Sequence, residues 1–456
     1  MSELFAPLFA TPALAECFGD RAWLQALLDF EAALARVQSA AGKIPKPAAD
    51  AIAAACRAER FDPRALGEAA RAAGNPVIPL VRALGEALPR EAAGFVHLGA
   101  TSQDALDTAL MLLARRGLEL VRAELAGAAE GCAALAAAHR ATPLAARTLL
   151  QQALPTSFGA KASGWLVALL DADDRLAELR ARGLAVQLGG AAGTLAALEP
   201  GGLALAAALA RELGLAEPLV PWHAARGRIA ELASALGVAA GALGKVALDV
   251  ALLAQSEVAE VREAGGPGRG GSSTLPQKRN AVGAANALAC AKRTPGLVAT
   301  ILSALPQEHE RGLGGWPLEW EVLPELFRLT GAAAAHVAGA LHGLEVDPAR
   351  MRANLDAAGG ALVAERVALA LAPALGRAAA QEKVESVCRR ARERGEALLD
   401  VLAADPKIAA QLPRPALAAL LDPSDYLGAS AELVERALAR HRERRGTSRG
   451  SPGLPK

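Results

Sequence analysis

A ten-residue run in the second half of the chain combines the groups that proton transfer and anion binding need. It reads GSSTLPQKRN, from Gly271 to Asn280, and residues 265–271 hold five glycines and one proline. Glycine leaves the backbone free to close over a ligand. Ser272 brings a hydroxyl that can move a proton, Lys278 brings a positive charge, and Asn280 stands where the N-cap of a following helix is expected. The run therefore predicts an active-site loop, with an anion bound at the start of that helix.

A flexible surface loop that happens to contain serine and lysine is the alternative interpretation of this run. The tripeptide Gly-Ser-Ser alone would favour that interpretation. The fixed spacing of Pro276, Lys278 and Asn280 behind the two serines favours an active-site loop instead.

Three segments of the chain resemble conserved regions of the fumarase/aspartase superfamily. Gly271–Asn280 is similar to the signature G-S-S-x-M-P-x-K-x-N, with Leu275 in place of the usual methionine. Phe95–Asp104 (FVHLGATSQD) resembles the first conserved region, and Arg147–Gln151 (RTLLQ) resembles the second. The segments come in the order that the superfamily has, and the resemblance covers the chain from about residue 90 to about residue 325.

The resemblance implies a role for individual residues. Members of the superfamily make or break a bond at the β-carbon of a carboxylate substrate, and the electrons pass through an aci-carboxylate. A hydroxyl then handles the carbon-bound proton, while cations and amides stabilise the charge on the carboxylate. Ser272 matches the catalytic serine. The residues expected to bind the substrate are Thr101, Ser102, Thr148, Gln151, Lys278 and Asn280.

Two departures from the superfamily pattern narrow the chemistry. Most of these lyases have histidine in a Thr-His-Gly sequence, where this chain has Thr148-Leu149-Leu150, and a glutamate where this chain has Ala285. The His–Glu pair handles the proton of a heteroatom leaving group, which leucine and alanine cannot do. A carboxylate that leaves or attacks is a stable anion and needs no such help. Cycloisomerisation fits this requirement. Further segments, among them Gln152–Thr156 (QALPT) and Leu188–Thr194 (LGGAAGT), resemble a subfamily that closes a muconate tricarboxylate into a lactone.

His97 and Arg311 are further candidates for binding a tricarboxylate, which needs several cationic anchors. His97 could equally be a histidine whose bonds are satisfied in the core, and Arg311 could simply pair with Glu308 or Glu310. His223 is expected to be structural or on the surface. No spacing of ligand residues indicates a metal site, and the expected chemistry requires no cofactor.

Two other functions remain open at this point. One is a C–N lyase that acts on adenylosuccinate or argininosuccinate, which the missing His–Glu pair disfavours. The other is a catalytically silent helical tetramer, which retention of Ser272, Lys278 and Asn280 disfavours.

Composition limits the class of protein. The 456 residues are 52% apolar but only 3% aromatic, which favours long, closely packed helices. Lys plus Arg number 49 against 48 Asp plus Glu, so neither nucleic acid nor an acidic membrane is expected as a partner. Five cysteines without C-x-x-C spacing, and no basic N-terminal region ahead of an apolar stretch, favour a reduced cytoplasmic protein.

Apolar residues recur at the helical period in five long stretches. The expected helices run from about 103 to 140, 156 to 184, 228 to 261, 281 to 305 and 322 to 344. The resemblance implies an all-α fold in which five such helices form a central bundle and four chains share a twenty-helix core. We expect three helical domains (1–100, 101–345 and 346–441), a disordered tail (442–456), and a homotetramer with shared active sites.

Overall fold

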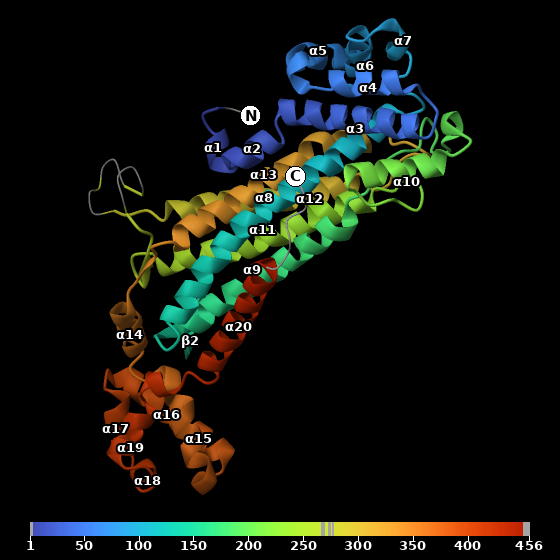
Figure 1. Ribbon diagram of the computed structural model, residues 1–456. Helices are drawn as coiled ribbons and strands as arrows, with labels where there is room; N and C mark the ends of the chain where they lie inside the picture. The colour runs from blue at the N-terminus through green and yellow to red at the C-terminus, as the bar shows by residue number, and fades with distance from the viewer. Residues whose placement is uncertain (1–2, 266–269, 272–274, 276–277, 450–456) are drawn as a thin grey trace. The chain divides into compact units, whose positions relative to one another are not determined.

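A computed structural model describes residues 3–265, 270–271, 275 and 278–449 of the chain (Figure 1). Ser272 and Pro276 lie outside the described residues. Within them the chain forms twenty α-helices and two two-stranded antiparallel sheets, so the predicted all-α class is confirmed. The chain divides into two compact units, 1–127 with 171–244 and 286–336, and 128–170 with 245–285 and 337–456.

Five long helices have residues in both units. They are α8 (Ser102–Ala138), α9 (Phe158–Glu178), α11 (Gly227–Leu253), α12 (Val282–Ser303) and α13 (Gly315–Leu341). All five were predicted from the apolar period. The prediction for α11 ran eight residues too far, because the chain turns at Gln255–Val258 and Ala259 takes a positive φ. The prediction for α13 began seven residues too late, since Pro317 is tolerated in a first helical turn.

Glycine brings α8 and α13 into close contact. In the first unit a Cβ on Gly117 would lie 2.9 Å from the ring of Phe327, and in the second a Cβ on Gly131 would lie 2.8 Å from Leu341 Cβ. Most of the buried residues on the five long helices are alanine or leucine, as expected for closely packed helices of this composition. α11 has the length and apolar composition that could cross a membrane, yet half of its most apolar window is buried, as in the core helix of a bundle.

The first unit also contains the short N-terminal helices and α10. In Figure 1, α4 to α7 lie on the side of α3 that faces away from the long helices. Their bounds are α1 Ala6–Phe9, α2 Pro12–Cys17, α3 Asp20–Ala40, α4 Lys46–Ala55, α5 Pro63–Ala73, α6 Val77–Glu86, α7 Arg90–Ala93 and α10 Gly202–Leu213, with short helical turns at Ala58–Arg60, Leu179–Gly183 and Ala196–Leu198.

The second unit contains both sheets and the C-terminal helices. One sheet pairs β1 (Pro143–Thr148) with β2 (Gln151–Ser157), and the other pairs β3 (Val261–Arg262) with β4 (Glu345–Val346). The hairpin β1–β2 was not predicted. The helices are α14 Pro348–Asp356, α15 Ala364–Leu375, α16 Arg377–Arg394, α17 Leu398–Ala404, α18 Pro406–Ala409, α19 Arg414–Leu420 and α20 Ser430–Arg449, with turns at Ala361–Val363 and Pro423–Asp425.

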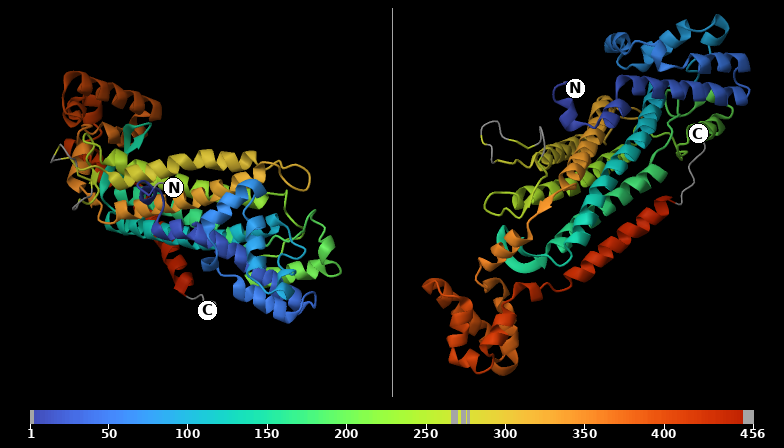
Figure 2. Two further views of the ribbon diagram at one scale, coloured as in Figure 1. Left: turned by 90° about the horizontal axis from the view of Figure 1, so that it is seen from above. Right: turned by 60° about the vertical axis from the view of Figure 1, so that its left-hand side comes forward.

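Helices α15 to α19 lie close together (Figure 2). They share a small apolar core built around Val367, Leu371, Val384 and Leu402. The prediction of a disordered tail from residue 442 was wrong for residues 442–449, which are the last two turns of α20. Arginine and glutamate are good helix formers, and Arg444 donates a hydrogen bond to the carbonyl of Leu170 on α9. The three-domain division stays a prediction.

The cysteines are all free, and three are buried. Burial raises the pKa of the Cys132 thiol to about 12, which suits a packing role.

Candidate active site

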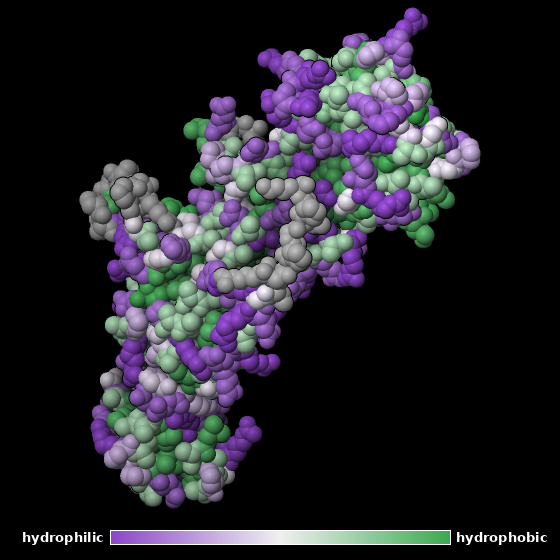
Figure 3. Space-filling view, in the orientation of Figure 1, coloured by the Kyte–Doolittle hydropathy of each residue, from purple (hydrophilic) through white to green (hydrophobic). Residues whose placement is uncertain are grey.

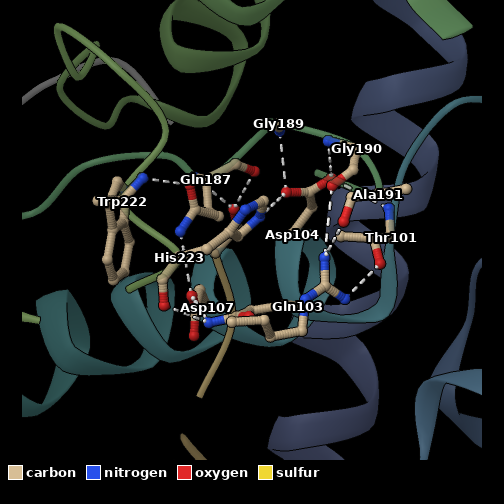
Figure 4. A network of polar contacts seen from close by, with 12 residues as sticks. Thr101, Gln103, Asp104, Asp107, Gln187, Gly189, Gly190, Ala191, Trp222 and His223 are labelled. Carbon is tan, nitrogen blue, oxygen red and sulfur yellow. Dashed lines mark hydrogen bonds and ion pairs between the residues drawn. The ribbon is translucent and has the colours of Figure 1, made fainter. Parts of the chain in front are cut away.

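The first turn of α8 is built around Thr101 and Asp104. The Asp104 carboxylate returns to accept a hydrogen bond from the Thr101 backbone N–H at 3.0 Å, as the fourth residue of a capping box does (Figure 4). Ser102 is the first residue of α8 and is partly buried. The predicted Thr-Ser turn therefore stands at the positive end of a long helix, where the helix dipole favours an anion.

Asp104 also holds a glycine loop against this turn. Its two oxygens accept hydrogen bonds from the backbone N–H groups of Gly189 and Gly190, both at 3.0 Å, and Oδ1 lies 2.7 Å from His223 Nε2. Asp104 and His223 are buried. Gly190 takes a positive φ of 69°, which brings consecutive N–H groups onto one carboxylate. One side chain thereby fixes two backbone segments 85 residues apart.

Arg311 joins the same two segments from the loop between α12 and α13. Its guanidinium donates to Thr101 Oγ1 at 2.9 Å and to the carbonyl of Ala191 at 2.8 Å. The alternative that Arg311 pairs with Glu308 or Glu310 is not found in the described part of the chain, where the guanidinium instead contacts Thr101 and the Gly190–Ala191 backbone and the Glu308 carboxylate accepts from the Leu313 N–H. Since Thr101 Oγ1 accepts from Arg311, its own hydroxyl proton is directed to another acceptor, such as a substrate carboxylate.

A buried cluster of charged residues contacts α8 shortly after Thr101. Arg226 donates to both oxygens of Asp107, at 2.7 and 2.9 Å, and to both oxygens of Glu319. Burial alone would lower the pKa of Arg226, but the two carboxylates outweigh it and raise that pKa, so the arginine stays charged. Trp316 donates its indole N–H to Asp107 at 3.1 Å and is thus part of the core. This cluster fixes α8 against α13 beneath Thr101.

His97 lies in a buried pair with Glu31 on α3. Its Nδ1 is 2.6 Å from Glu31 Oε1, and the two side chains are 15% and 2% exposed. Burial opposes the charged imidazole, but the charge and hydrogen bond of Glu31 outweigh it, so the pKa of His97 is raised. His97 also holds a positive φ of 57°, which is uncommon outside glycine. The imidazolium that Glu31 favours is the form that could attract an anion.

The second predicted segment is the tip of the hairpin β1–β2 in the second unit. Thr148 pairs with Gln151, and Leu149 and Leu150 form a two-residue turn with φ of 50° and 65°. Both central residues thus have positive φ, as a type I′ turn requires, although bulky side chains disfavour that conformation. The leucines are 97% and 76% exposed, and Thr148 and Gln151 are exposed beside them.

The third segment also lies in the second unit. Lys278 is exposed, and Asn280 donates its backbone N–H to the carbonyl of Gly270 at 2.8 Å. The expectation that Asn280 caps α12 was wrong, because α12 begins at Val282 and Ala281 precedes it. The helix start does bind a carboxylate, but that carboxylate belongs to Glu263, which accepts from the N–H groups of Gly283 and Ala284 at 3.0 and 2.8 Å.

The structure thus gathers the predicted residues in two groups. The first unit holds His97, Thr101, Ser102 and Arg311, and the second holds Thr148, Gln151, Lys278 and Asn280. Sequence reasoning gave no orienting role to Asp104, Glu260 and Glu263. His223 was expected to be structural or on the surface, and it is buried against Asp104. The spacing Thr101-x-x-Asp104 before an apolar run could have revealed Asp104 as a capping residue. Partners 119 residues apart, such as Asp104 and His223, give no local signal.

The two groups offer hydroxyl, guanidinium, imidazole, ammonium and amide groups, which suit a substrate with several carboxylates. Among the residues that the structure describes, no cluster of His, Cys, Asp and Glu could hold a metal ion.

Comparison with known proteins agrees with these features. The family model described as "Lyase" matches residues 9–296, and the model described as "Adenylosuccinate lyase C-terminus" matches residues 360–437. The 3-carboxy-cis,cis-muconate cycloisomerase of Pseudomonas aeruginosa is 52% identical over 96% of both chains. The nitrosuccinate lyase of Streptomyces davaonensis is 45% identical, over 96% of this chain and 94% of its own.

A solved structure shares the fold as well. The crystal structure of the 3-carboxy-cis,cis-muconate lactonizing enzyme from Pseudomonas putida superposes with a TM-score of 0.92 at 48% identity, covering 97% of this chain and 99% of that one. Because the family model matches residues 9–296 and relatives are about half identical over nearly the whole chain, the chain belongs to the lyase family of the fumarase/aspartase superfamily.

Proposed function

We propose that this protein is a 3-carboxy-cis,cis-muconate cycloisomerase, an intramolecular lyase that forms 4-carboxymuconolactone in the protocatechuate branch of the β-ketoadipate pathway. The observation that carries the proposal is the hairpin tip. Leu149 is almost fully exposed there, and Ala285 is exposed on the first turn of α12, where relatives place a His–Glu pair. Neither side chain can exchange a proton with a heteroatom. The identity with enzymes of that name supports the same reaction.

The reaction then proceeds in two linked events. An oxygen of one substrate carboxylate attacks the alkene carbon β to another carboxylate, and the C–O bond of the lactone forms. The alkene electrons move onto that second carboxylate, which becomes an aci-carboxylate, and Ser272 delivers a proton to its α-carbon. Thr101, Ser102, Thr148, Gln151, Lys278 and Asn280 bind the carboxylates, with Arg311 and His97 as cationic supports.

The proposed enzyme is a cytoplasmic homotetramer that uses no cofactor or metal. Each active site takes the Thr101 turn, the hairpin tip and the signature segment from three different chains. Figure 3 shows apolar residues on the surface of the molecule, which support the assembly. Val238 and Leu248 on α11 and Leu302 on α12 are each 44–50% exposed. Exposed apolar side chains on long helices are typical of faces buried between subunits. Small tricarboxylates are its ligands, with neither nucleic acid nor membrane as a partner.

The test is turnover of 3-carboxy-cis,cis-muconate by the purified protein, followed by loss of diene absorbance and by NMR of the product. The lactone is expected. Ser272→Ala should lower kcat by at least the ~10²-fold that a general acid contributes, because the variant lacks the proposed proton donor. Equal turnover by Ser272→Ala would remove the serine from the mechanism, and absence of the lactone from the native reaction would refute the function.

Elimination of nitrite from nitrosuccinate is the second candidate. The 45% identity with a nitrosuccinate lyase favours it, and nitrite, like a carboxylate, is a stable anion that leaves without a proton donor. Nitrite release faster than lactone formation would favour this candidate. Cleavage of adenylosuccinate or argininosuccinate would require a proton for the departing nitrogen, which leaves that C–N lyase alternative without a donor at Leu149 or Ala285.

A further inference from the structure

One short segment of the second unit contacts the hairpin β1–β2 and the residues around Lys278 and Asn280, the two places in that unit that are proposed to bind substrate. It runs from Glu260 to Glu263, with β3 between the two glutamates. β3 pairs with β4, Val261 opposite Val346 and Arg262 opposite Glu345, so the backbone of the segment is fixed on one side. Both glutamates are buried, at 0% and 6% exposure. Buried carboxylates remain only where donors compensate the lost water, so the partners of these two define what the segment does.

Glu260 holds the hairpin. Arg147, the residue before Thr148, donates to both of its oxygens at 2.9 and 2.7 Å. Asn354 on α14 donates to Glu260 Oε1 at 2.8 Å and accepts from Gln152 at 3.2 Å. Arg147 and Gln152 are register partners, so both strands of the hairpin are tied at the step just below the tip.

Glu263 holds the end of the signature segment, residues 278–280, next to the start of α12. Its carboxylate spans the N–H groups of Gly283 and Ala284 at the start of α12, and Arg279 donates to its backbone carbonyl at 2.8 Å. Arg279 also forms two hydrogen bonds with Glu345 of β4, at 3.0 and 2.7 Å. Lys278 and Asn280 flank Arg279, so their backbone positions follow from these contacts.

The place that a substrate carboxylate was expected to fill is therefore occupied by a carboxylate of the protein. A helix N-terminus whose partial positive charge is already neutralised contributes little to the binding of a substrate carboxylate. The hydrogen bonds of Glu263 have a structural effect instead, because they fix the end of β3 to α12, which is a long helix.

We propose that Glu263 is a positioning residue that sets Lys278 and Asn280 for the substrate by tying β3 to α12. The inference rests on the proposed function for its substrate class. A cap that only stabilises α12 could be replaced by any acceptor at the helix start. A link between β3 and α12 is not restored by an acceptor that belongs to α12 itself.

Three variants separate the two roles. Glu263→Gln removes the charge and one of the two acceptors. Glu263→Gln combined with Ala281→Asp supplies a new acceptor at the N-cap position, where aspartate bonds the N–H groups of the first turn. Asp62→Asn is the matched control, because Asp62 caps α5 in the other unit by accepting from Arg64 N–H at 2.9 Å.

Thermal unfolding, kcat and KM for 3-carboxy-cis,cis-muconate are measured for each variant. Glu263→Gln is expected to lose at least tenfold in kcat/KM, chiefly through KM. Adding Ala281→Asp should restore the Tm but not kcat/KM, and Asp62→Asn should keep native kcat/KM. Recovery of activity together with Tm in the double variant, or native kcat/KM in Glu263→Gln, would overturn the proposal. If Glu263→Gln does not fold, the kcat/KM of the double variant alone tests the proposal.

Failure of the proposed function has a different signature. If the native protein does not lactonise carboxymuconate, the same variants are compared by calorimetric binding of tricarballylate, an unreactive tricarboxylate. A tenfold weaker affinity that Ala281→Asp does not restore would still support positioning by Glu263, and an affinity unchanged from native would refute it.

Discussion

At the scale of single residues, Asp104 is the residue of the first unit whose substitution we expect to affect stability and activity most. Its buried carboxylate accepts from three backbone N–H groups and faces His223, so an amide in its place would turn an N–H group toward donors. We expect Asp104→Asn to cost on the order of 1–3 kcal/mol of unfolding free energy, the penalty for leaving buried donors without an acceptor. It should also lower kcat/KM, since Thr101 loses its fixed position.

Asp173→Asn is the control for this change. Asp173 pairs with Arg122 at 2.7 Å in the same unit but is partly exposed. Denaturant unfolding and kinetics of both variants give the comparison. An Asp104→Asn protein as stable and as active as the Asp173→Asn protein would contradict the role assigned to Asp104.

His97 and Glu31 make stability depend on pH. The pKa of His97 is raised above its ordinary value of 6.5, so the pair stabilises the folded protein fully below pH 6.5. That stabilisation is lost as the pH rises through the raised pKa. Glu31→Gln removes the cause of the shift. The Tm difference between the native protein and Glu31→Gln should be largest near pH 6 and shrink toward pH 9. A difference that stays constant over this range would show that the pair does not titrate as described.

At the scale of secondary-structure elements, the hairpin β1–β2 is the feature with the clearest strain. Asparagine and glycine accept the positive φ of a type I′ turn more readily than leucine does. If Leu149 and Leu150 had no role, Leu149→Asn with Leu150→Gly would therefore be as active as the native protein and at least as stable. We expect instead a loss of at least tenfold in kcat/KM and easier dissociation of the proposed tetramer, because the proposed shared site places the exposed leucines against substrate or a second chain.

Steady-state kinetics and light scattering at falling protein concentration test this expectation. Leu219→Asn serves as the control, since Leu219 is 96% exposed on a loop of the first unit. Native activity and native assembly in the hairpin variant would refute the role of the tip.

Elements also show where sequence-based prediction works. The five long helices followed from apolar residues at the helical period, which is a local signal. The hairpin did not follow, because Leu149-Leu150 lacks the glycine and asparagine that mark a tight turn. The cap of α12 was assigned to Asn280 because it is nearest in sequence, whereas the carboxylate that binds there comes from Glu263, about 20 residues earlier. Signature residues could be named in advance, whereas His223 and Glu260 lie 119 and 113 residues from the residues that they contact, Asp104 and Arg147.

At the scale of the whole molecule, the central expectation is that sites are shared among chains. Co-refolding Thr101→Val with Ser272→Ala, each inactive alone, should restore up to about a quarter of native activity, since each site needs two native segments from different chains. Each variant refolded alone is the control. No recovery in tetramers confirmed to be mixed would contradict shared sites, and a monomer by light scattering would do so sooner.

The most direct test of the function is the ratio of kcat/KM for 3-carboxy-cis,cis-muconate to kcat/KM for adenylosuccinate, argininosuccinate and nitrosuccinate, measured on one preparation of the native protein. Because Leu149 and Ala285 cannot protonate a departing nitrogen, we predict a preference for lactonisation of at least ~100-fold over either C–N cleavage, and lactonisation faster than nitrite release. Cleavage of adenylosuccinate or argininosuccinate at an equal or higher kcat/KM, or nitrite release exceeding lactone formation, would contradict the assignment.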